Sequence, residues 1–532
     1  MASSTKNYNP DVLSSSINFS SSISDDLLRT STSEDEPEIP VSPTKRYPQS
    51  IIAHSIDQSG KIKYLVKYRN RSYYELEWLE SNELMNLLSN MSMIRNYQKN
   101  QDIHISTKPP YFNNDYLIPE KIITEQVCEG QIKYLIKWFD LDYVDATWES
   151  IDFIKQHHFN VSYNPNYHDS ENNVNLEQGI ENALKQYRKL SIRPSDKELK
   201  IPHHPNPNSF SPIKQNNFPK SKNGFEVRSY QVEGVNFLIK LWYLQKNAIL
   251  ADEMGLGKTL QSLMFLNMLV ARQKIWGPFL IIAPLSTIPN WEREANEWTE
   301  LRYLSFYGSK TRRSLMLQNE LFYIDSKIPK FQILFTTYDY AVKMIDVFNK
   351  IEWQVIVLDE AHRIKNNKSK LFSSLMKLQT KFKLLITGTP LQNNTNELWT
   401  LLHYLNDEKF NDSKEFNEKF GNLSEAEQIE DLQQILRPLM LRRLKGDVEK
   451  SITPFEEIII ECPMSQHQKA YYTSIYQQNM QYLTRGQHTV NQISLRNICM
   501  ELRKCCNHPY LINGAEKQIM VERREAQARK GH

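Results

Sequence analysis

Short apolar runs recur between residues 248 and 386 and are separated by segments whose apolar positions have helical spacing. The runs have the length of buried strands rather than of core helices. Strands that alternate with helices form parallel sheets covered by helices on both faces. The pattern therefore predicts a parallel α/β sheet with strands at 248–250, 279–283, 333–335, 355–358 and 384–386.

Two similar segments precede this region, each with a Lys-rich alternating strand, a turn and a tryptophan. The first runs from Gly60 to Tyr68 and continues to Trp78, and the second starts at Gly130 and repeats the pattern at a constant offset. Alternation with a period of two is typical of strands with one buried face. We expect two small β-rich domains, at 50–100 and 110–162.

Four further regions differ in composition. Residues 1–49 are rich in Ser and Asn, with few apolar residues, and predict a disordered Ser-rich tail. Residues 163–224 are Asn- and Lys-rich and interrupted by prolines, which indicates a linker. The α/β lobe then occupies 225–464. From 465 to 532 the spacing is helical, which predicts a helical extension at the start of a truncated second lobe.

Composition restricts the class of protein. Lys and Arg number 65 against 62 Asp and Glu, and a net charge of +3 does not by itself imply nucleic-acid binding. The 5 cysteines are odd in number and scattered, which favours a reducing compartment. No apolar stretch approaches the roughly 20 residues that span a bilayer, so we expect no membrane partner.

A phosphate-binding motif follows the first predicted strand and opens a helix. It runs from Asp252 to Thr259 as Asp-Glu-Met-Gly-Leu-Gly-Lys-Thr. Glycines such as Gly255 and Gly257 let backbone N–H groups approach phosphates, Lys258 can reach the β and γ oxygens, and Thr259 can hold magnesium. The implied ligands are ATP and Mg²⁺. Asp252 replaces the first glycine of the strict pattern, so coincidence is the alternative for this motif alone.

A pair of carboxylates, Asp359 and Glu360, directly follows the predicted strand 355–358. Asp359 would bind magnesium, while Glu360 would position and deprotonate an attacking water. With Lys258 they form the candidate catalytic set. The alternative is a solvated helix start, where acids interact favourably with the helix dipole.

A third loop, from Thr387 to Asn393, follows the strand 384–386 and carries small hydroxyl residues that suit a sensor of the γ-phosphate. Alone it is only a turn. Ligands of α/β sheets bind at the carboxyl ends of the strands. Three such loops in this order therefore predict one nucleotide site.

Together these motifs resemble the first lobe of the switch/sucrose-nonfermenting remodelling ATPases, within the DEAD/DEAH-type helicases, over about 225–513. The resemblance implies a RecA-like helicase lobe and DNA-dependent ATP hydrolysis. It implies that Gln231 reads the adenine edge. It also implies that Ser286, Thr287, Thr337 and Tyr338 follow the DNA backbone, where hydroxyls and N–H groups contact phosphates. Ordinary loop caps are the alternative for the Ser and Thr residues.

The last motif of the resemblance is the segment 439–447, which contains a basic cluster of Arg442, Arg443 and Lys445. Two interpretations are equal at this point. The cluster is either a nucleic-acid patch or the basic face of a helix.

The repeated segments resemble chromodomains, which in the family bind histone tails through an aromatic cage around methylated lysine. The resemblance makes Trp138, and Tyr68 at the equivalent position, candidates for histone-tail contact. The next cage position is Leu141 in one segment and Arg71 in the other. These departures weaken the interpretation as methyl-lysine readers.

The later tryptophans, Trp78 and Trp148, are interpreted as core residues that supply buried area. Two chromodomains before such an ATPase resemble the chromodomain-helicase-DNA-binding remodellers. That resemblance alone implies a nuclear location and binding to double-stranded DNA, nucleosomes and histone tails. The partner subunits are not indicated.

The sequence is compatible with three functions. The first is an ATP-dependent chromatin-remodelling ATPase that moves nucleosomes. Family members carry a second α/β lobe with an arginine motif, which we do not find here, so we expect this chain to bind ATP and DNA but to hydrolyse ATP poorly alone. The second is a non-enzymatic chromatin-binding module or truncated regulator. The third, a strand-separating helicase or repair translocase, leaves the chromodomains unexplained.

Overall fold

The computed structural model describes residues 46–56, 61–88, 91–104, 111–128, 130–158, 170–200, 205–324, 326–388, 395–420, 426–449, 457–484 and 492–530. The chain divides into two compact units, Met1–Lys450 and Ser451–His532. Residues 1–45 of the predicted tail lie outside the described residues. Among the described residues, no helix has the length and apolar character needed to cross a membrane.

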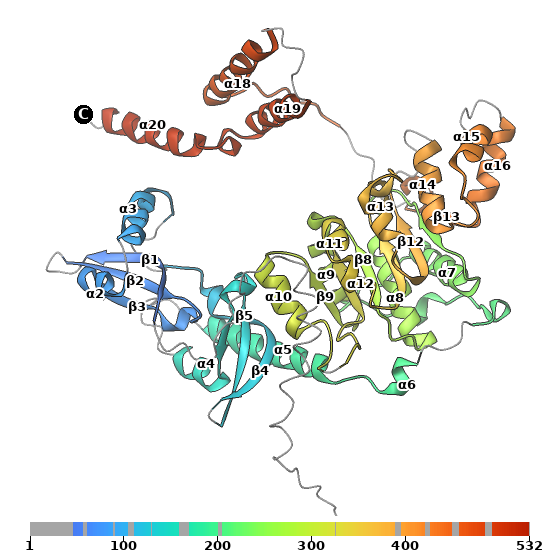
Figure 1. The fold of residues 1–532 in the computed structure, drawn as a ribbon, viewed down its shortest axis with the longest axis horizontal. Helices are drawn as coiled ribbons and strands as arrows, with labels where there is room; N and C mark the ends of the chain where they lie inside the picture. The colour runs from blue at the N-terminus through green and yellow to red at the C-terminus, as the bar shows by residue number, and fades with distance from the viewer. Residues whose placement is uncertain are drawn as a thin grey trace, which may run out of the picture. The chain divides into compact units, whose positions relative to one another are not determined.

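Two antiparallel sheets with the same strand order begin the first unit (Figure 1). The second strand pairs with both neighbours in each sheet, and the first strand carries two register shifts at matching places. Since a shared bulge pattern reflects a shared backbone path, the repeat seen in the sequence corresponds to two copies of one architecture. The strands are β1 (Pro48–Ile56), β2 (Ile62–Tyr68), β3 (Glu77–Glu80), β4 (Pro119–Cys128), β5 (Gln131–Trp138) and β6 (Thr147–Glu149).

Helices follow each sheet. After the first come α2 (Ser81–Leu87) and α3 (Ser92–His104), and after the second comes α4 (Ile151–His158). The segment predicted as a linker contains the 22-residue helix α5 (Ser170–Ser191) and the short α6 (Asp196–Leu199). Apolar positions at helical spacing, among them Leu176, Ile180 and Ala183, are buried in the core of the second sheet.

A seven-stranded sheet forms the centre of the first unit, with the order β13-β7-β12-β11-β8-β10-β9. The registered pairs are all parallel, which confirms the predicted fold class. The five predicted strands are present, and β9 and β13 are additional. The bounds are β7 (Ala248–Leu250), β8 (Phe279–Ile282), β9 (Tyr303–Phe306), β10 (Ile333–Thr336), β11 (Trp353–Leu358), β12 (Thr380–Ile386) and β13 (Met440–Leu441).

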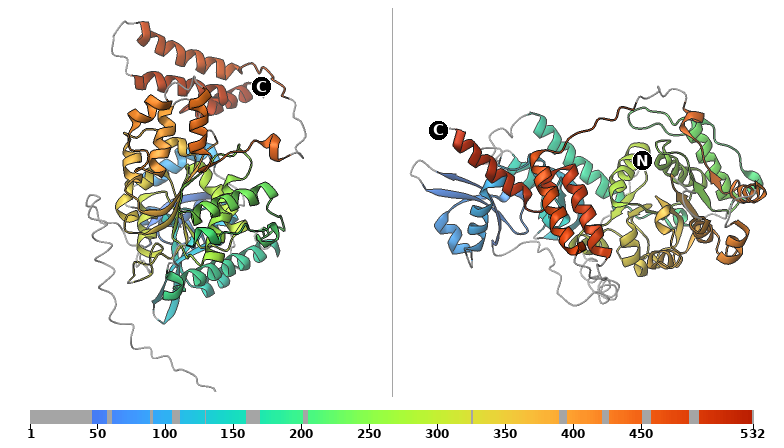
Figure 2. Two further views of the ribbon diagram at one scale, coloured as in Figure 1. Left: turned by 90° about the vertical axis from the view of Figure 1, so that its right-hand side faces the viewer. Right: turned by 90° about the horizontal axis from the view of Figure 1, so that it is seen from above.

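Helices cover both faces of this sheet (Figures 1 and 2). Neighbouring strand residues point to opposite faces, so that Ile281 joins one core cluster and Leu280 the other. The cluster of Ile281 contains α7 (Ser229–Tyr243), α8 (Lys258–Gln273) and α9 (Ile288–Trp298). The cluster of Leu280 contains α10 (Lys310–Asn319), α11 (Tyr338–Lys343), α12 (Ile345–Phe348), α13 (Lys370–Leu375), α14 (Thr395–Leu405), α15 (Ser413–Phe420) and α16 (Ala426–Leu436).

The second small sheet packs directly on the edge of this lobe. Lys121 of β4 forms an ion pair with Glu320, which caps α10, and Tyr143 donates its hydroxyl proton to the same carboxylate at 3.1 Å. Arg312 of α10 lies over the Tyr143 ring at 4.9 Å. The α5 helix adds a bond from Lys189 Nζ to the Glu300 backbone oxygen at 2.9 Å. Polar and apolar contacts therefore join this small domain to the lobe.

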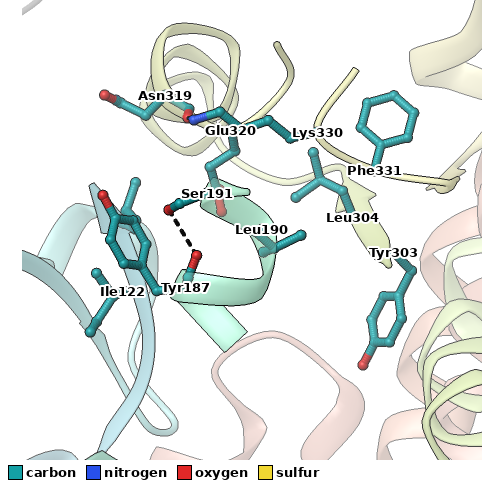
Figure 3. Close-up of a pocket in the computed structure, with 11 residues that line it drawn as sticks. Ile122, Tyr187, Leu190, Ser191, Tyr303, Leu304, Asn319, Glu320, Lys330 and Phe331 are labelled. Atoms are coloured by element: carbon teal, nitrogen blue, oxygen red, sulfur yellow. Dashed lines mark hydrogen bonds between the residues drawn. The ribbon is translucent and has the colours of Figure 1, made fainter. Parts of the chain in front are cut away.

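A pocket lies at this junction (Figure 3). Its walls come from β4, the end of α5, β9 and the segment after α10; Leu190 points toward Leu304, and the Tyr187 ring lies beside Ile122. Ser191 Oγ donates to the Tyr187 backbone oxygen at 2.8 Å. None of the predicted nucleotide residues lines this pocket.

The second unit is helical, as the sequence predicts. It contains α18 (Gln466–Thr484), α19 (Gln492–Asn507) and α20 (Ala515–Lys530). Gln468 Nε2 donates to the backbone oxygens of Cys505 and Cys506 at 3.2 and 2.9 Å, which ties α18 to the end of α19. Tyr471 donates to Gln518 Oε1 of α20 at 3.2 Å.

Candidate nucleotide site

Four loops with candidate residues leave the sheet at one edge. They follow β7, β12, β11 and β8, which are consecutive neighbours in the parallel sheet. Backbone bonds fix their starts side by side, from Thr387 N to the Leu250 oxygen at 3.2 Å and from Asp359 N to the Ile282 oxygen at 2.9 Å. The topology therefore brings together the loops that the sequence singled out.

The phosphate loop is built on two glycines with left-handed backbone. Gly255 has φ 90° and Gly257 has φ 75°, values that L side chains rarely adopt. A Cβ at Gly257 would lie 2.5 Å from Gln231 Nε2, so a larger residue there would displace the Gln231 side chain as well as strain the backbone. The α8 helix begins at the next residue, Lys258, which aims a helix N-terminus at the loop.

Lys258 folds back over the loop. Its Nζ donates to the backbone oxygens of Asp252 and Glu253 at 2.8 and 3.3 Å. Burial lowers the pKa of the Lys258 ammonium, and the carboxylates of Asp252, Glu360 and Asp359 oppose this shift. The Lys258 ammonium therefore lies close to the carboxylates of the neighbouring loops. Thr259, the next residue of α8, is partly exposed.

Asp252 explains why this loop departs from the strict glycine pattern. The residue is 0% exposed, and its carboxylate accepts Gln261 Nε2 at 3.1 Å and Arg443 Nη2 at 2.6 Å. Arg443 is thus turned inward, which neither interpretation of the basic cluster anticipated for it. Arg442 next to it is exposed.

Asp359 accepts hydrogen bonds from Trp291, Tyr338 and Glu360 N, and a longer one from Thr287 at 3.5 Å. Trp291 Nε1 donates to Asp359 Oδ2 at 2.9 Å, Tyr338 donates its hydroxyl proton to the Asp359 backbone oxygen at 2.6 Å, and Glu360 N donates to Oδ1 at 3.0 Å. Burial raises the pKa of the Asp359 carboxyl, against the opposing effect of the Trp291 N–H. A partly buried carboxylate held in one orientation suits a ligand of a hard cation.

Glu360 has a left-handed backbone with φ 53°. Such a conformation is strained for a residue with a side chain and is often found at functional sites. Its carboxylate lies 3.2 Å from His362 Nδ1. Gln231, the predicted adenine contact, is buried, and its Oε1 accepts the Arg228 N–H at 3.0 Å.

The four DNA candidates differ in access. Ser286 is exposed in the turn after β8, and Thr287 is partly buried, with its hydroxyl donating to the Pro284 oxygen at 2.9 Å. Thr337 is buried and caps α11, and Tyr338 is 2% exposed. The buried Tyr338 side chain supports Asp359, and its assignment to a DNA path stays a prediction. The cap interpretation holds for Thr337.

The aromatic candidates of the small domains all contribute to hydrophobic cores, and Trp78 and Trp148 pack against core clusters as the core interpretation expects. Tyr68 and Trp138 are each 1% exposed, while Trp78 and Trp148 are partly exposed. Trp138 Nε1 donates to Thr147 Oγ1 at 3.0 Å. Because a cage needs an open ring face, Tyr68 and Trp138 are core residues in this structure rather than cage walls.

Of the third predicted loop, Thr387 and Gly388 belong to the described residues, while 389–394 lie outside them. Thr387 is buried at the end of β12. The sensor interpretation of this loop stays a prediction.

Comparison with known proteins identifies the class. The chain belongs to the SNF2-related domain family, whose pattern matches residues 230–511. The chromo (CHRromatin Organisation MOdifier) domain pattern matches residues 117–161, over the second small sheet. The first small sheet shares its architecture. The SNF2-related match extends past the predicted lobe boundary into the helical unit.

Individual relatives confirm the resemblance to the chromodomain-helicase-DNA-binding proteins. Chromodomain-helicase-DNA-binding protein 8 of Rattus norvegicus is 40% identical over 481 residues, which are 87% of this chain and 17% of that protein. Chromodomain-helicase-DNA-binding protein 6 of Homo sapiens is 40% identical over 480 residues, 87% of this chain and 16% of that protein. The chain thus spans about a sixth of these relatives. A Sulfolobus solfataricus SWI2/SNF2 ATPase core in complex with dsDNA is 26% identical, with a TM-score of 0.41 over 60% of this chain and 66% of that chain.

Proposed function

We propose that this chain binds Mg²⁺-ATP and double-stranded DNA as part of a chromatin-remodelling ATPase, which uses ATP hydrolysis to move nucleosomes in the nucleus. One observation carries the proposal. A lysine at a helix start, Lys258, and a partly buried carboxylate, Asp359, come from loops at the same edge of a parallel sheet. Family membership supports the reaction class.

The residues of the phosphate loop fit a triphosphate. The positive φ values at Gly255 and Gly257, neither of which has a Cβ, let the backbone N–H groups at the start of α8 approach the phosphates. The Lys258 ammonium exchanges its bonds with the loop carbonyls for the β and γ oxygens, a stronger charge-assisted interaction. Gln231, packed against the loop, contacts the adenine edge.

The acidic pair fits the metal and the attacking water. Thr259 and Asp359 offer the oxygen ligands that Mg²⁺ prefers. Bound Mg²⁺ neutralises charge on the β and γ phosphates. Trp291 and Tyr338 keep Asp359 in one orientation. Glu360, whose carboxylate is free of the bonds that hold Asp359, accepts a proton from the water.

DNA engagement is assigned to the loop after β8. Ser286 is exposed there, and Thr287 offers a second hydroxyl 3.5 Å from Asp359 Oδ2. Thr287, a candidate DNA contact, therefore lies next to Asp359, the candidate metal ligand. The second small domain, fixed to the lobe through Glu320, presents its remaining surface to chromatin.

Phosphate release by the full chain, with and without duplex DNA or nucleosomes, tests this function. Because we expect this chain to hydrolyse ATP poorly alone, we expect slow turnover that rises with DNA and disappears in Lys258→Ala. Nucleosome binding combined with turnover that Lys258→Ala leaves unchanged would contradict the proposal. Nucleosome binding with no ATP binding at all would favour a non-enzymatic chromatin-binding module.

A further inference from the structure

The segment after β13 runs beside the phosphate loop and bonds to it residue by residue. Ala251 N donates to the Leu441 oxygen at 2.7 Å, and Glu253 N donates to the Arg443 oxygen at 3.0 Å. Two residues later, Lys445 N donates to Glu253 Oε2 at 2.6 Å. The pairing of β13 with β7 therefore continues past both strands into the loop itself.

Arg443 makes the strongest of these connections through its side chain. Nε and Nη2 donate to the two carboxylate oxygens of Asp252 at 3.1 and 2.6 Å, a bidentate pair. Nη2 also donates to Gln261 Oε1 of α8 at 2.9 Å, and Nη1 donates to the Tyr230 backbone oxygen. One guanidinium thus joins the phosphate loop to both helices that flank it, α7 and α8.

Because the Asp252 and Arg443 side chains are shielded from water, each charge depends on the other as its partner. The Asp252 side chain is 0% exposed and that of Arg443 is 12% exposed. A buried charge without its partner is strongly unfavourable, so the two groups fix each other's position. Gly234 of α7 leaves room for the arrangement, because a Cβ there would overlap with Gln261 Oε1 and lie 2.9 Å from Arg443 Nη2.

The geometry points to Arg443 as a positioning residue of the nucleotide site. It holds Asp252, whose backbone oxygen bonds Lys258 Nζ at 2.8 Å, and thereby sets where the loop begins. The inference rests on the proposed function, since it requires that the loop binds the phosphates of ATP. Arg443 acts through Asp252 and Gln261 and touches no phosphate itself.

Titration of the full chain with Mg²⁺-ATP tests this role, with the melting temperature measured on the same samples. We expect Arg443→Gln to weaken ATP binding about 10- to 100-fold, the range for loss of a group that orients a ligand-binding residue. Arg442→Gln, the exposed neighbour, is the matched control and should bind like the wild type. A lower melting temperature with unchanged affinity in folded Arg443→Gln would overturn the role.

Two further variants keep the test decisive if Arg443→Gln does not fold. Arg443→Lys retains the buried charge but loses the bidentate geometry, and we expect a smaller loss of affinity. Asp252→Asn should weaken binding as well, and the double variant should lose less than the product of the two single losses. Wild-type affinity in Arg443→Lys or independent losses would overturn the inference. An ATP affinity that Lys258→Ala leaves unchanged would instead overturn the proposed function and this role with it.

Discussion

Replacing Glu320 by glutamine removes the charge that joins the second small domain to the ATPase lobe. Glu320 pairs with Lys121 and accepts the Tyr143 hydroxyl, and its side chain is 6% exposed. Burial lowers the pKa of Lys121, but the attraction of Glu320 outweighs burial and holds that pKa above its usual value. The variant therefore leaves a buried ammonium without its counter-charge.

The free energy lost in Glu320→Gln follows from the burial of this ion pair. Breaking a buried ion pair by removing one partner costs about 3–5 kcal/mol. The lower end applies here because the Lys121 side chain keeps 20% exposure and can reach water. A loss of about 3 kcal/mol corresponds to about a 100-fold rise in the population of the open junction.

Hydrogen exchange measured by mass spectrometry on the intact chain reports this opening. Peptides from β4 and α10 should exchange about 100-fold faster in Glu320→Gln, while β2 of the first small domain should not change. Glu352→Gln, at an exposed position of the same lobe, is the control. The double variant Lys121→Met with Glu320→Gln removes both charges and should recover most of the protection. Exchange of the junction at the wild-type rate in Glu320→Gln would refute the reasoning.

Two further predictions concern stability. Burial, with repulsion from Glu75, raises the pKa of Glu149 to about 7. A carboxyl with a raised folded-state pKa stabilises the fold below its unfolded-state pKa and loses this contribution as pH rises through the folded value. Calorimetry should therefore show about 3 kcal/mol of stability lost between about pH 4.5 and pH 7, and Glu149→Gln should abolish this loss; an equal slope in both would contradict it. Gly234→Ala should lower the melting temperature despite a helix propensity gain of about 1 kcal/mol, because its Cβ would overlap with Gln261 Oε1; an unchanged or higher value would count against the packing around Arg443.

The central sheet could be predicted because its strands are buried on both faces and appear as short apolar runs. Ser305 interrupts the apolar residues of β9 (Tyr303–Phe306), and β13 (Met440–Leu441) has only two residues. Neither strand therefore appears as a distinct apolar run in the sequence. The helix α5 was hidden by the Asn-rich composition around it. Its apolar positions have helical spacing, but the prolines after residue 201 favour a linker.

The candidate site was predicted as a set of loops, but not the contacts inside it. Lys258, Asp359 and Glu360 are visible because they follow strands in a fixed order. Their supports, Trp291 and Arg443, come from distant parts of the chain and become neighbours only when the parallel strands align. Sequence spacing carries no signal for such pairs.

The depth to which each aromatic ring is buried could not be predicted from the sequence. Tyr68 and Trp138 end the central strands of their sheets, pair there with the first strand and donate side-chain hydrogen bonds to the third, while Trp78 and Trp148 lie on the short third strands. The central strand of a small sheet is its most covered position. Residue type alone does not reveal which of two aromatic positions occupies it.

Calorimetric titration of the intact chain with ATP, with and without Mg²⁺, tests the nucleotide site most directly. Lys258→Ala should weaken ATP binding at least about tenfold in both conditions, since a charge-assisted bond contributes about 1.5–3 kcal/mol. Asp359→Asn should keep the Mg²⁺-free affinity and lose the gain that Mg²⁺ adds. Lys246→Ala, at an exposed position before β7, should bind like the wild type. Equal ATP affinity in the wild type, Lys258→Ala and Asp359→Asn would contradict the assignment of this sheet edge as the nucleotide site.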